Sequence, residues 1–243
     1  MKLILNILSV ILITFPFLQI SAQNPDTLQT SSGKLLIKVV GHASIMFEYN
    51  QMIIHIDPYS RMGNYKLMPK ADLILLTHHH QDHLDTAAIH LIHQNNTHYI
   101  VAPVCAEKAS FKNPAVLISN GEKMLFKDIQ IEAVPAYNIL NKRESGVPYH
   151  PEGEGNGYIL TFGDKRIYIA GDTEIIPEMN QLGKIDVAFL PMNLPYTMSP
   201  EMTAEAAKVI QPVILYPYHY SKTDLSILVG LLNDEKTIEV RIR

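Results

Sequence analysis

The sequence predicts an α/β fold, and three observations support this prediction. Short apolar runs of strand length recur along the chain, among them "SIMFEY" at 44–49 and "ADLILLT" at 71–77. A helix is marked over 199–212, where Ser199 can cap the start, Pro200 fits the first position and Pro212 ends it. Strand-like and helix-like segments alternate in the second half, which is typical of α/β proteins.

The first half is predicted to be rich in strands, after a polar lead-in over 24–33. "ADLILLT" is apolar throughout, which indicates a strand buried on both faces. Helices are expected over 85–94 and 103–110. The expected strands of this half cover 34–40, 44–49, 51–57, 71–77, 98–103, 115–119 and 129–136.

In the second half, a hairpin about Gly163-Asp164 is expected to join strands 157–162 and 165–172. The longest irregular stretch runs from Asn138 to Asn156, and a loop of that length inside a compact domain is usually functional. The remaining predicted elements are helices over 174–182, 199–212 and 224–234, and strands over 186–191, 212–220 and 237–243.

The N-terminus resembles a secretory signal peptide. Lys2 precedes a mostly apolar run over 3–20, and small residues follow near a plausible cleavage site. We therefore expect a signal peptide at 1–22 and an exported domain at 23–243, periplasmic or secreted. An uncleaved anchor is the alternative, but polar residues interrupt the run, which is short for a span of about 20 residues. No stable membrane anchor is expected after cleavage.

Composition excludes several classes of function. The formal net charge is −4 and basic residues form no run, which argues against a nucleic-acid partner. Cys105 is the only cysteine, so the chain cannot form an internal disulfide, and a buried apolar role is expected for it. The sequence contains no glycine-rich phosphate loop and no G-x-S-x-G motif, which disfavours nucleotide and serine-nucleophile chemistry.

The stretch "LTHHHQDHLD" concentrates metal-ligating side chains directly after a predicted buried strand. His78, His80, Asp82 and His83 follow Thr77 before the next helix begins. Imidazole and carboxylate are donors that transition metals prefer, and open α/β sheets place their sites at the carboxyl ends of strands. One such loop could hold two neighbouring metals.

Three more donors also follow predicted strands. They are Asp172 in "IAGDTE", His219 in "YPYHY" and Asp57 in "IIHIDP". A solvated loop with chance histidines is the alternative, but chance would scatter such residues rather than place each at a strand end. The combined pattern therefore predicts a metal centre.

These residues resemble the signature of the metallo-β-lactamase superfamily: His78-x-His80-x-Asp82-His83, then Asp172 in "GDT" and His219 in "HY". The stretches "GHAS", "HPEGEGNGYIL" and "LPYTMSPEMTAEAA" are similar to the branch that contains N-acyl-phosphatidylethanolamine phospholipase D and ascorbate-6-phosphate lactonase. The resemblance covers most of the chain after the signal peptide. It implies a four-layer αββα sandwich with a dinuclear site at one edge.

The resemblance also implies a role for each donor. The first metal would take His78 and His80, the second would take Asp82, His83 and His219, and Asp172 would bridge both. Asp57 would orient the histidine loop from behind, although a turn-forming role before Pro58 is an alternative.

One position departs from the pattern. In the phospholipase branch a histidine follows the strand that ends here in "VPA", but this chain has Asn138 at that place. We expect His150, in the same loop, to reach the first metal, because imidazole is a better zinc ligand than a carboxamide. Asn138 or water remain the alternatives. His42 in "GHAS" is a minor candidate for lining the site.

The implied activity is hydrolysis by a hydroxide that a dinuclear zinc-type site activates, with Asp82 orienting that hydroxide. The bond would be an ester, lactone or phosphodiester in a small-molecule or lipid-like substrate. Two Zn²⁺ ions are expected, with Mn²⁺ or Fe as alternatives. A redox member, a non-catalytic member and a periplasmic β-lactamase remain alternative functions. His80 stands where di-iron relatives carry an acid, which favours hydrolysis.

Overall fold

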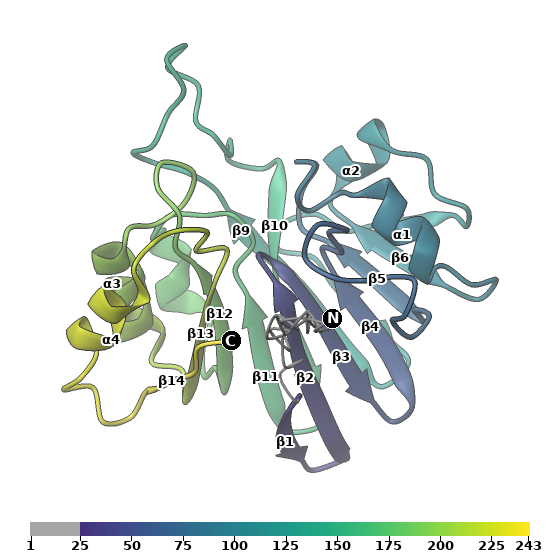
Figure 1. Cartoon of the computed structure of the whole chain (residues 1–243), viewed down its shortest axis with the longest axis horizontal. Coiled ribbons are helices and arrows are strands. Elements are labelled where there is room, and N and C mark those ends of the chain that lie inside the picture. The colour runs from purple at the N-terminus through teal and green to yellow at the C-terminus, as the bar shows by residue number, and fades with distance from the viewer. Residues whose placement is uncertain (1–24) are drawn as a thin grey trace, which may run out of the picture.

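The computed structural model describes residues 25–243, so the predicted signal peptide at 1–22 lies outside the described residues. Two seven-stranded sheets face one another, with helices on both outer faces (Figure 1). Each sheet has its strands in chain order from one edge to the other. Within residues 25–243 we find no helix with the length and apolar character needed to cross a bilayer.

The first sheet begins antiparallel and becomes parallel from its fourth strand onward. Helices α1 (Thr86–Ile92) and α2 (Pro103–Lys108) lie on its outer face (Figure 1). Its strands are β1 (Asp26–Thr30), β2 (Gly33–Gly41), β3 (Ser44–Tyr49), β4 (Met52–Ile56), β5 (Leu73–Leu76), β6 (His98–Val101) and β7 (Ala115–Leu117).

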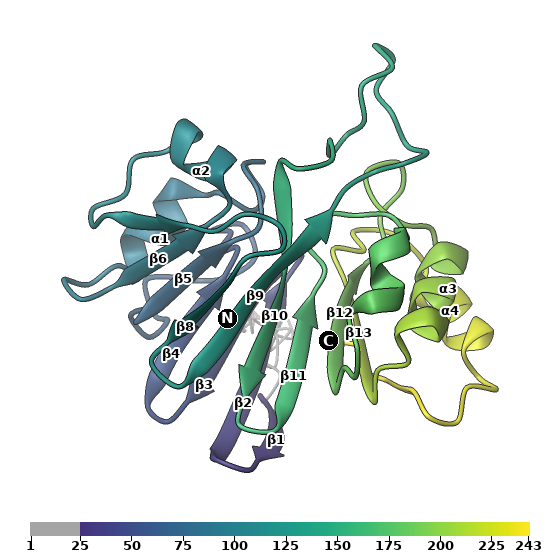
Figure 2. The same ribbon diagram turned by 180° about the vertical axis from the view of Figure 1, so that it is seen from behind.

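The second sheet is antiparallel through its first four strands and parallel in the rest. Helices α3 (Pro200–Ile210) and α4 (Leu225–Leu231) and the 3₁₀ helix η1 (Pro177–Gln181) cover its outer face (Figure 2). Its strands are β8 (Lys123–Phe126), β9 (Ile129–Ala136), β10 (Gly155–Phe162), β11 (Lys165–Ile169), β12 (Val187–Pro191), β13 (Ile214–Tyr218) and β14 (Glu239–Val240).

Three apolar layers hold these elements together. The central layer packs side chains of both sheets against one another, for example Phe47 against Phe162 and Phe189. The outer layers pack each sheet against its own helices. This arrangement confirms the predicted four-layer αββα sandwich.

Several local predictions are confirmed. All four residues of β5 are buried, as its continuous apolar run predicted. The Ser199 hydroxyl accepts a hydrogen bond from the Met202 amide and caps α3. Gly163 and Asp164 form the turn of the predicted hairpin, and Cys105 is fully buried.

Other predictions were wrong. The lead-in expected over 24–33 is not loose where it is described, from residue 25 onward, because β1 pairs with β2 and Asp26 binds Arg243 at 2.6 Å. The helix expected over 174–182 is only η1, since a proline disfavours helical conformation in the residue before it and Pro177 lies inside this range. The final strand is shortened to β14, and β8 was not predicted.

The loop between β9 and β10 projects beyond the sheets, at the top of Figure 1. Lys142 and Pro148 form an isolated antiparallel bridge, and the Arg143 amide donates to the Val147 carbonyl at 2.8 Å. The segment from Lys142 to Pro148 is therefore a short hairpin. The carboxyl ends of β4, β5 and β13 reach the same edge of the sandwich as the base of this loop.

Candidate metal centre

The predicted donors converge at this edge in two groups that share Asp172. In the first group, His80 Nδ1 lies 3.1 Å from His78 Nε2 and 3.1 Å from His150 Nε2. His150 Nε2 lies 3.2 Å from Asp172 Oδ2. Three imidazoles and one carboxylate therefore face a common point.

The second group lies on the other side of Asp172. His83 Nε2 is 3.3 Å from Asp172 Oδ1, and His219 Nε2 is 3.3 Å from Asp172 Oδ2. His219 Nε2 is also 3.4 Å from Asp82 Oδ2. All seven residues of the predicted ligand set are therefore brought together, with Asp172 between the two groups.

The spacing of these donors is that of ligands around a cation. Tetrahedral zinc with bonds of about 2.0–2.1 Å holds its ligand atoms roughly 3.3 Å apart. The six distances above run from 3.1 to 3.4 Å. Strong hydrogen bonds around the same site are shorter, for example 2.8 Å from His83 Nδ1 to Asp57 Oδ2.

Unpartnered buried atoms support the same conclusion. His83 Nε2, His219 Nε2 and Asp172 Oδ1 are buried and make no hydrogen bond of good geometry among the described residues, although both nitrogens lie 3.3 Å from Asp172 oxygens. A buried polar atom without a partner costs about 1–3 kcal/mol. A cation between these atoms would satisfy them, so the residues present fit a bound metal.

Asp57 supports the histidine loop from below, as predicted for it. It is fully buried and accepts hydrogen bonds from the Thr77 amide at 2.8 Å and the Thr77 hydroxyl at 2.6 Å. It also accepts from His83 Nδ1, so that Nε2 faces the centre and can bind a metal once it has lost its proton.

Asn138 and His150 share the position that the sequence left open. Asn138 Oδ1 accepts hydrogen bonds from the His150 amide at 2.8 Å and from His150 Nδ1 at 2.7 Å. The carboxamide therefore lies behind the imidazole and directs His150 Nε2 at the first group. Of the three alternatives, this geometry favours His150 as the ligand.

We expect His150→Ala to lower the zinc content by about one ion per chain, because the first group loses one of its three imidazoles. His90→Ala removes an exposed imidazole of α1 and is the matched control. Metal analysis after dialysis measures both variants. Full retention of two tightly bound ions in His150→Ala would exclude His150 as a ligand.

Glu174 is a functional residue that the sequence did not identify. Its buried carboxylate accepts hydrogen bonds from three successive loop amides, those of Ile139, Leu140 and Asn141, at 2.7–2.8 Å. It also accepts from Asn138 Nδ2 at 3.2 Å. Glu174 thus fixes the start of the loop that carries His150. In the sequence, only its position two residues after Asp172 could have indicated a role near the centre.

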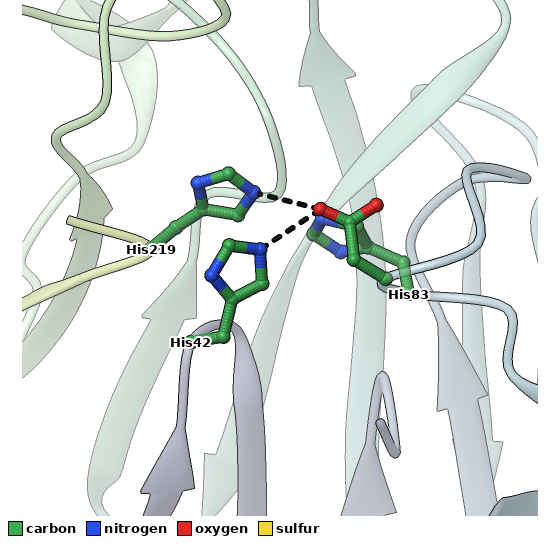
Figure 3. Close-up of side chains that lie close together, drawn as sticks. His42, His83 and His219 are labelled. Carbon is green, nitrogen blue, oxygen red and sulfur yellow. Dashed lines mark hydrogen bonds and ion pairs between the residues drawn. The ribbon is translucent and has the colours of Figure 1, made fainter. Parts of the chain in front are cut away.

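His42, which the sequence analysis named only as a minor candidate for lining the site, lies directly beside the metal centre. His42 Nε2 is 2.8 Å from Asp82 Oδ2, and the rings of His42 and His219 point toward this carboxylate (Figure 3). The 2.8 Å spacing is that of a hydrogen bond, so His42 positions Asp82, and its ring is also close enough to His83 and His219 to be a further ligand. In the sequence, the "GHAS" motif was the feature that indicated a place for His42 near the site.

The backbone at this edge adopts an uncommon conformation. His42, Asp57 and His219 have φ angles of 52°, 42° and 50°, in the left-handed region that non-glycine residues rarely occupy. The His219 amide donates to the His42 carbonyl at 2.8 Å, which ties two of these residues together. Such strain persists where the surrounding structure requires it, and here it directs side chains into the site.

Two histidines of the centre have opposite protonation tendencies. Burial and the nearby His150 lower the pKa of His80 to about 4, so His80 is neutral and ready to bind metal at pH 7. Burial alone would lower the pKa of His83, but the Asp172 and Asp57 carboxylates raise that pKa well above its usual value. The metal-free protein therefore holds His83 protonated at neutral pH.

Zinc binding at pH 7 should accordingly release at least one proton, the one held by His83, because a ligating imidazole must be neutral. Apparent zinc affinity then rises with pH. Calorimetric titration of the metal-free protein in buffers with different ionisation enthalpies measures the proton count. No buffer dependence would contradict the protonated state of His83.

An open cleft of about 320 Å³ lies over the centre. Tyr149 and Tyr196 form one wall as an edge-to-face pair with ring centroids 5.1 Å apart. Two other tyrosines of this region, Tyr137 and Tyr218, donate instead to the Glu178 carboxylate and the Gly171 carbonyl. The remaining lining residues are His80, Gln81, Asp82, Arg143, His150, Asp172, Asn193 and His219.

Residues 36–219 match the family model of the β-lactamase superfamily domain. Among curated relatives, the UPF0173 metal-dependent hydrolase TK0141 of Thermococcus kodakarensis is 34% identical over 198 residues, covering 76% of this chain and 84% of its own. The UPF0173 metal-dependent hydrolase NEQ378 of Nanoarchaeum equitans is 31% identical over 188 residues, covering 76% and 83%.

Solved structures agree with these relatives. A crystal structure from Parabacteroides distasonis, assigned as a metal-dependent hydrolase, is 44% identical with a TM-score of 0.84, covering 90% of this chain and 97% of its own. Igni18, a metallo hydrolase of Ignicoccus hospitalis, shares the fold at 23% identity and a TM-score of 0.70, covering 86% and 94%. The chain belongs to the β-lactamase superfamily and is one of its metal-dependent hydrolases.

Proposed function

We propose that this hydrolase binds two Zn²⁺ ions and cleaves an ester, lactone or phosphodiester bond. The observation that carries the proposal is the position of Asp172, which lies 3.2–3.3 Å from ligand nitrogens of both groups. Five imidazoles and two carboxylates favour zinc over magnesium or calcium, which prefer oxygen ligands. Mn²⁺ and Fe are the alternative metals.

Two bound cations would polarise the carbonyl or phosphoryl oxygen of the substrate and lower the pKa of water. Asp82 is the residue of the chain placed to direct that water. Its Oδ2 is held by His42, whereas its Oδ1 has no hydrogen-bond partner among residues 25–243. With a side chain 33% exposed toward the cleft, Asp82 can orient the attacking water and accept its proton.

The substrate is proposed to be a small or lipid-like molecule. The cleft over the centre has room for such a molecule, and its tyrosine wall offers apolar contact. The resemblance to the phospholipase and lactonase branch supports the same range of bonds. The signal-like sequence at 1–22 supports export, so the substrate would be met in the periplasm or outside the cell.

The test is a panel of aryl ester, lactone and phosphodiester substrates, assayed with the zinc-loaded, chelated and reloaded protein. We expect turnover of at least one bond type, its loss on chelation and its return with Zn²⁺ or Mn²⁺. Activity that survives complete removal of metal would exclude this mechanism. Two bound irons with an optical absorption band would instead support a redox enzyme.

A further inference from the structure

A single basic side chain faces the cleft among residues 25–243. Arg143, on the projecting hairpin, is the only Lys or Arg that lines it. Arg143 is exposed and has no carboxylate within 4.0 Å in the described part of the chain. Its charge is therefore available to a ligand.

The hairpin holds Arg143 in place. The Arg143 carbonyl accepts from the Gly146 amide at 2.8 Å, and its own amide donates to Val147. The guanidinium carbon lies 5.0 Å from the centroid of the Tyr149 ring, which restricts the side chain further. At the base of the hairpin, Glu174 fixes the backbone of residues 139–141. These bonds set the backbone of Arg143, and the Tyr149 ring and the Tyr149 carbonyl, 3.4 Å from Nη2, hold its exposed side chain beside the cleft.

The contact between Arg143 and His80 indicates what this position binds. Arg143 Nη2 lies 3.4 Å from His80 Nε2. When His80 Nδ1 ligates a metal, the neutral ring carries its proton on Nε2, so this nitrogen also becomes a donor. Two N–H donors then lie side by side at the cleft surface, and an oxygen anion can accept from both.

The electrostatics of the loaded site favour an anion as well. Two divalent cations carry four positive charges against three nearby carboxylates, those of Asp82, Asp172 and the buried Asp57, and Arg143 adds one more positive charge at the cleft. A metal at His80 Nδ1 would lie within about 8 Å of the guanidinium, given the width of an imidazole and a Zn–N bond of about 2.1 Å. The anionic group would thus be a few covalent bonds from the bond that is cleaved.

We infer that the substrate carries a carboxylate or phosphoryl group and that Arg143 is the residue that selects it. This inference rests on the proposed function, because it places the reacting bond at the metal centre. Arginine suits the task, since its planar fork of donors matches both anions.

The experiment measures binding separately from turnover. Acetohydroxamate, succinate monohydroxamate and phosphonoacetohydroxamate all carry a metal-binding group, but only the last two add an anion. Their dissociation constants are measured by calorimetry for the zinc-loaded wild type, Arg143→Ala and Lys142→Ala. Lys142 lies on the same hairpin but does not line the cleft, so it is the matched control.

We expect the wild type and Lys142→Ala to bind an anionic probe about 10- to 100-fold more tightly than acetohydroxamate. In Arg143→Ala this ratio should fall to about one, with an unchanged zinc content. The better of the two anionic probes identifies the substrate as a carboxylate or a phosphoryl compound. A ratio near one in the wild type, or an undiminished ratio in Arg143→Ala, would overturn the inference.

Turnover distinguishes this inference from the proposed function. The same proteins are assayed with 4-nitrophenyl acetate and 4-nitrophenyl hydrogen succinate, and kcat/KM should show the preference seen in binding. If neither ester nor any other bond type is cleaved but the binding ratio depends on Arg143, the anion site stands and the hydrolytic proposal fails. If no hydroxamate binds, the inference fails, and the activity panel with and without metal still decides the hydrolytic proposal.

Discussion

Asp172→Ala should abolish tight binding of both metals and lower kcat/KM by roughly a thousand-fold, or about 4 kcal/mol of barrier. The reason is that Asp172 lies within ligand distance of donors in both groups, at 3.3 Å from His83 and 3.2 Å from His150. Its loss also removes one of the three carboxylates, with Asp82 and Asp57, that would offset the charge of the cations. Metal analysis and the activity panel measure the two effects.

Two further variants distinguish loss of metal binding from loss of folding in Asp172→Ala. Asp172→Asn keeps the shape and removes the charge, and it should lose most of the bound metal as well. Asp234→Ala removes an exposed aspartate near the C-terminus and should leave metal content and activity unchanged. Two tightly bound ions in a folded Asp172→Ala protein would show that Asp172 does not bridge the centre.

Glu174→Ala should lower the free energy of unfolding by about 3 kcal/mol. The variant leaves the amides of residues 139–141 and Asn138 Nδ2 without the buried acceptor they share, and each lost hydrogen bond costs about 0.5–1.5 kcal/mol at such partly buried donors. Water can replace part of the lost bonding, which keeps the total below the sum. Urea unfolding of the metal-free protein measures the change.

The same variant should weaken zinc binding in the first group by roughly 10- to 100-fold, because the loop that presents His150 loses its anchor. Glu205→Ala, on the exposed face of α3, is the matched control and should change neither quantity. The stability and zinc affinity of Glu174→Gln should lie between those of Glu174→Ala and the wild type, since the glutamine amide keeps one acceptor oxygen. Wild-type stability in Glu174→Ala would contradict this role.

Much of the centre could be predicted because its ligands follow strands. His78, His80, Asp82 and His83 follow β5, and His219 follows β13, so the sheets bring these donors to one edge. The topology of the sandwich then places them, whatever the paths of the loops. The same argument covers Asp57 after β4.

The rest depended on tertiary contacts that sequence spacing does not fix. Asn138 and His150 are held by hydrogen bonds within a long loop, and the path of that loop is set by Glu174. The first strand was missed for a similar reason. The segment over Asp26–Thr30 is polar, and its pairing is supported by Arg243 at the far end of the chain.

Anomalous diffraction from crystals of the zinc-loaded protein tests the central claim most directly. The account predicts two zinc peaks on either side of Asp172, one about 2.1 Å from nitrogens of His78, His80 and His150, and the other bound by Asp82, His83 and His219. Data collected above and below the zinc absorption edge identify the metal. Crystals with no peak at this edge of the sandwich, or a single ion bound without Asp172, would contradict the dinuclear centre.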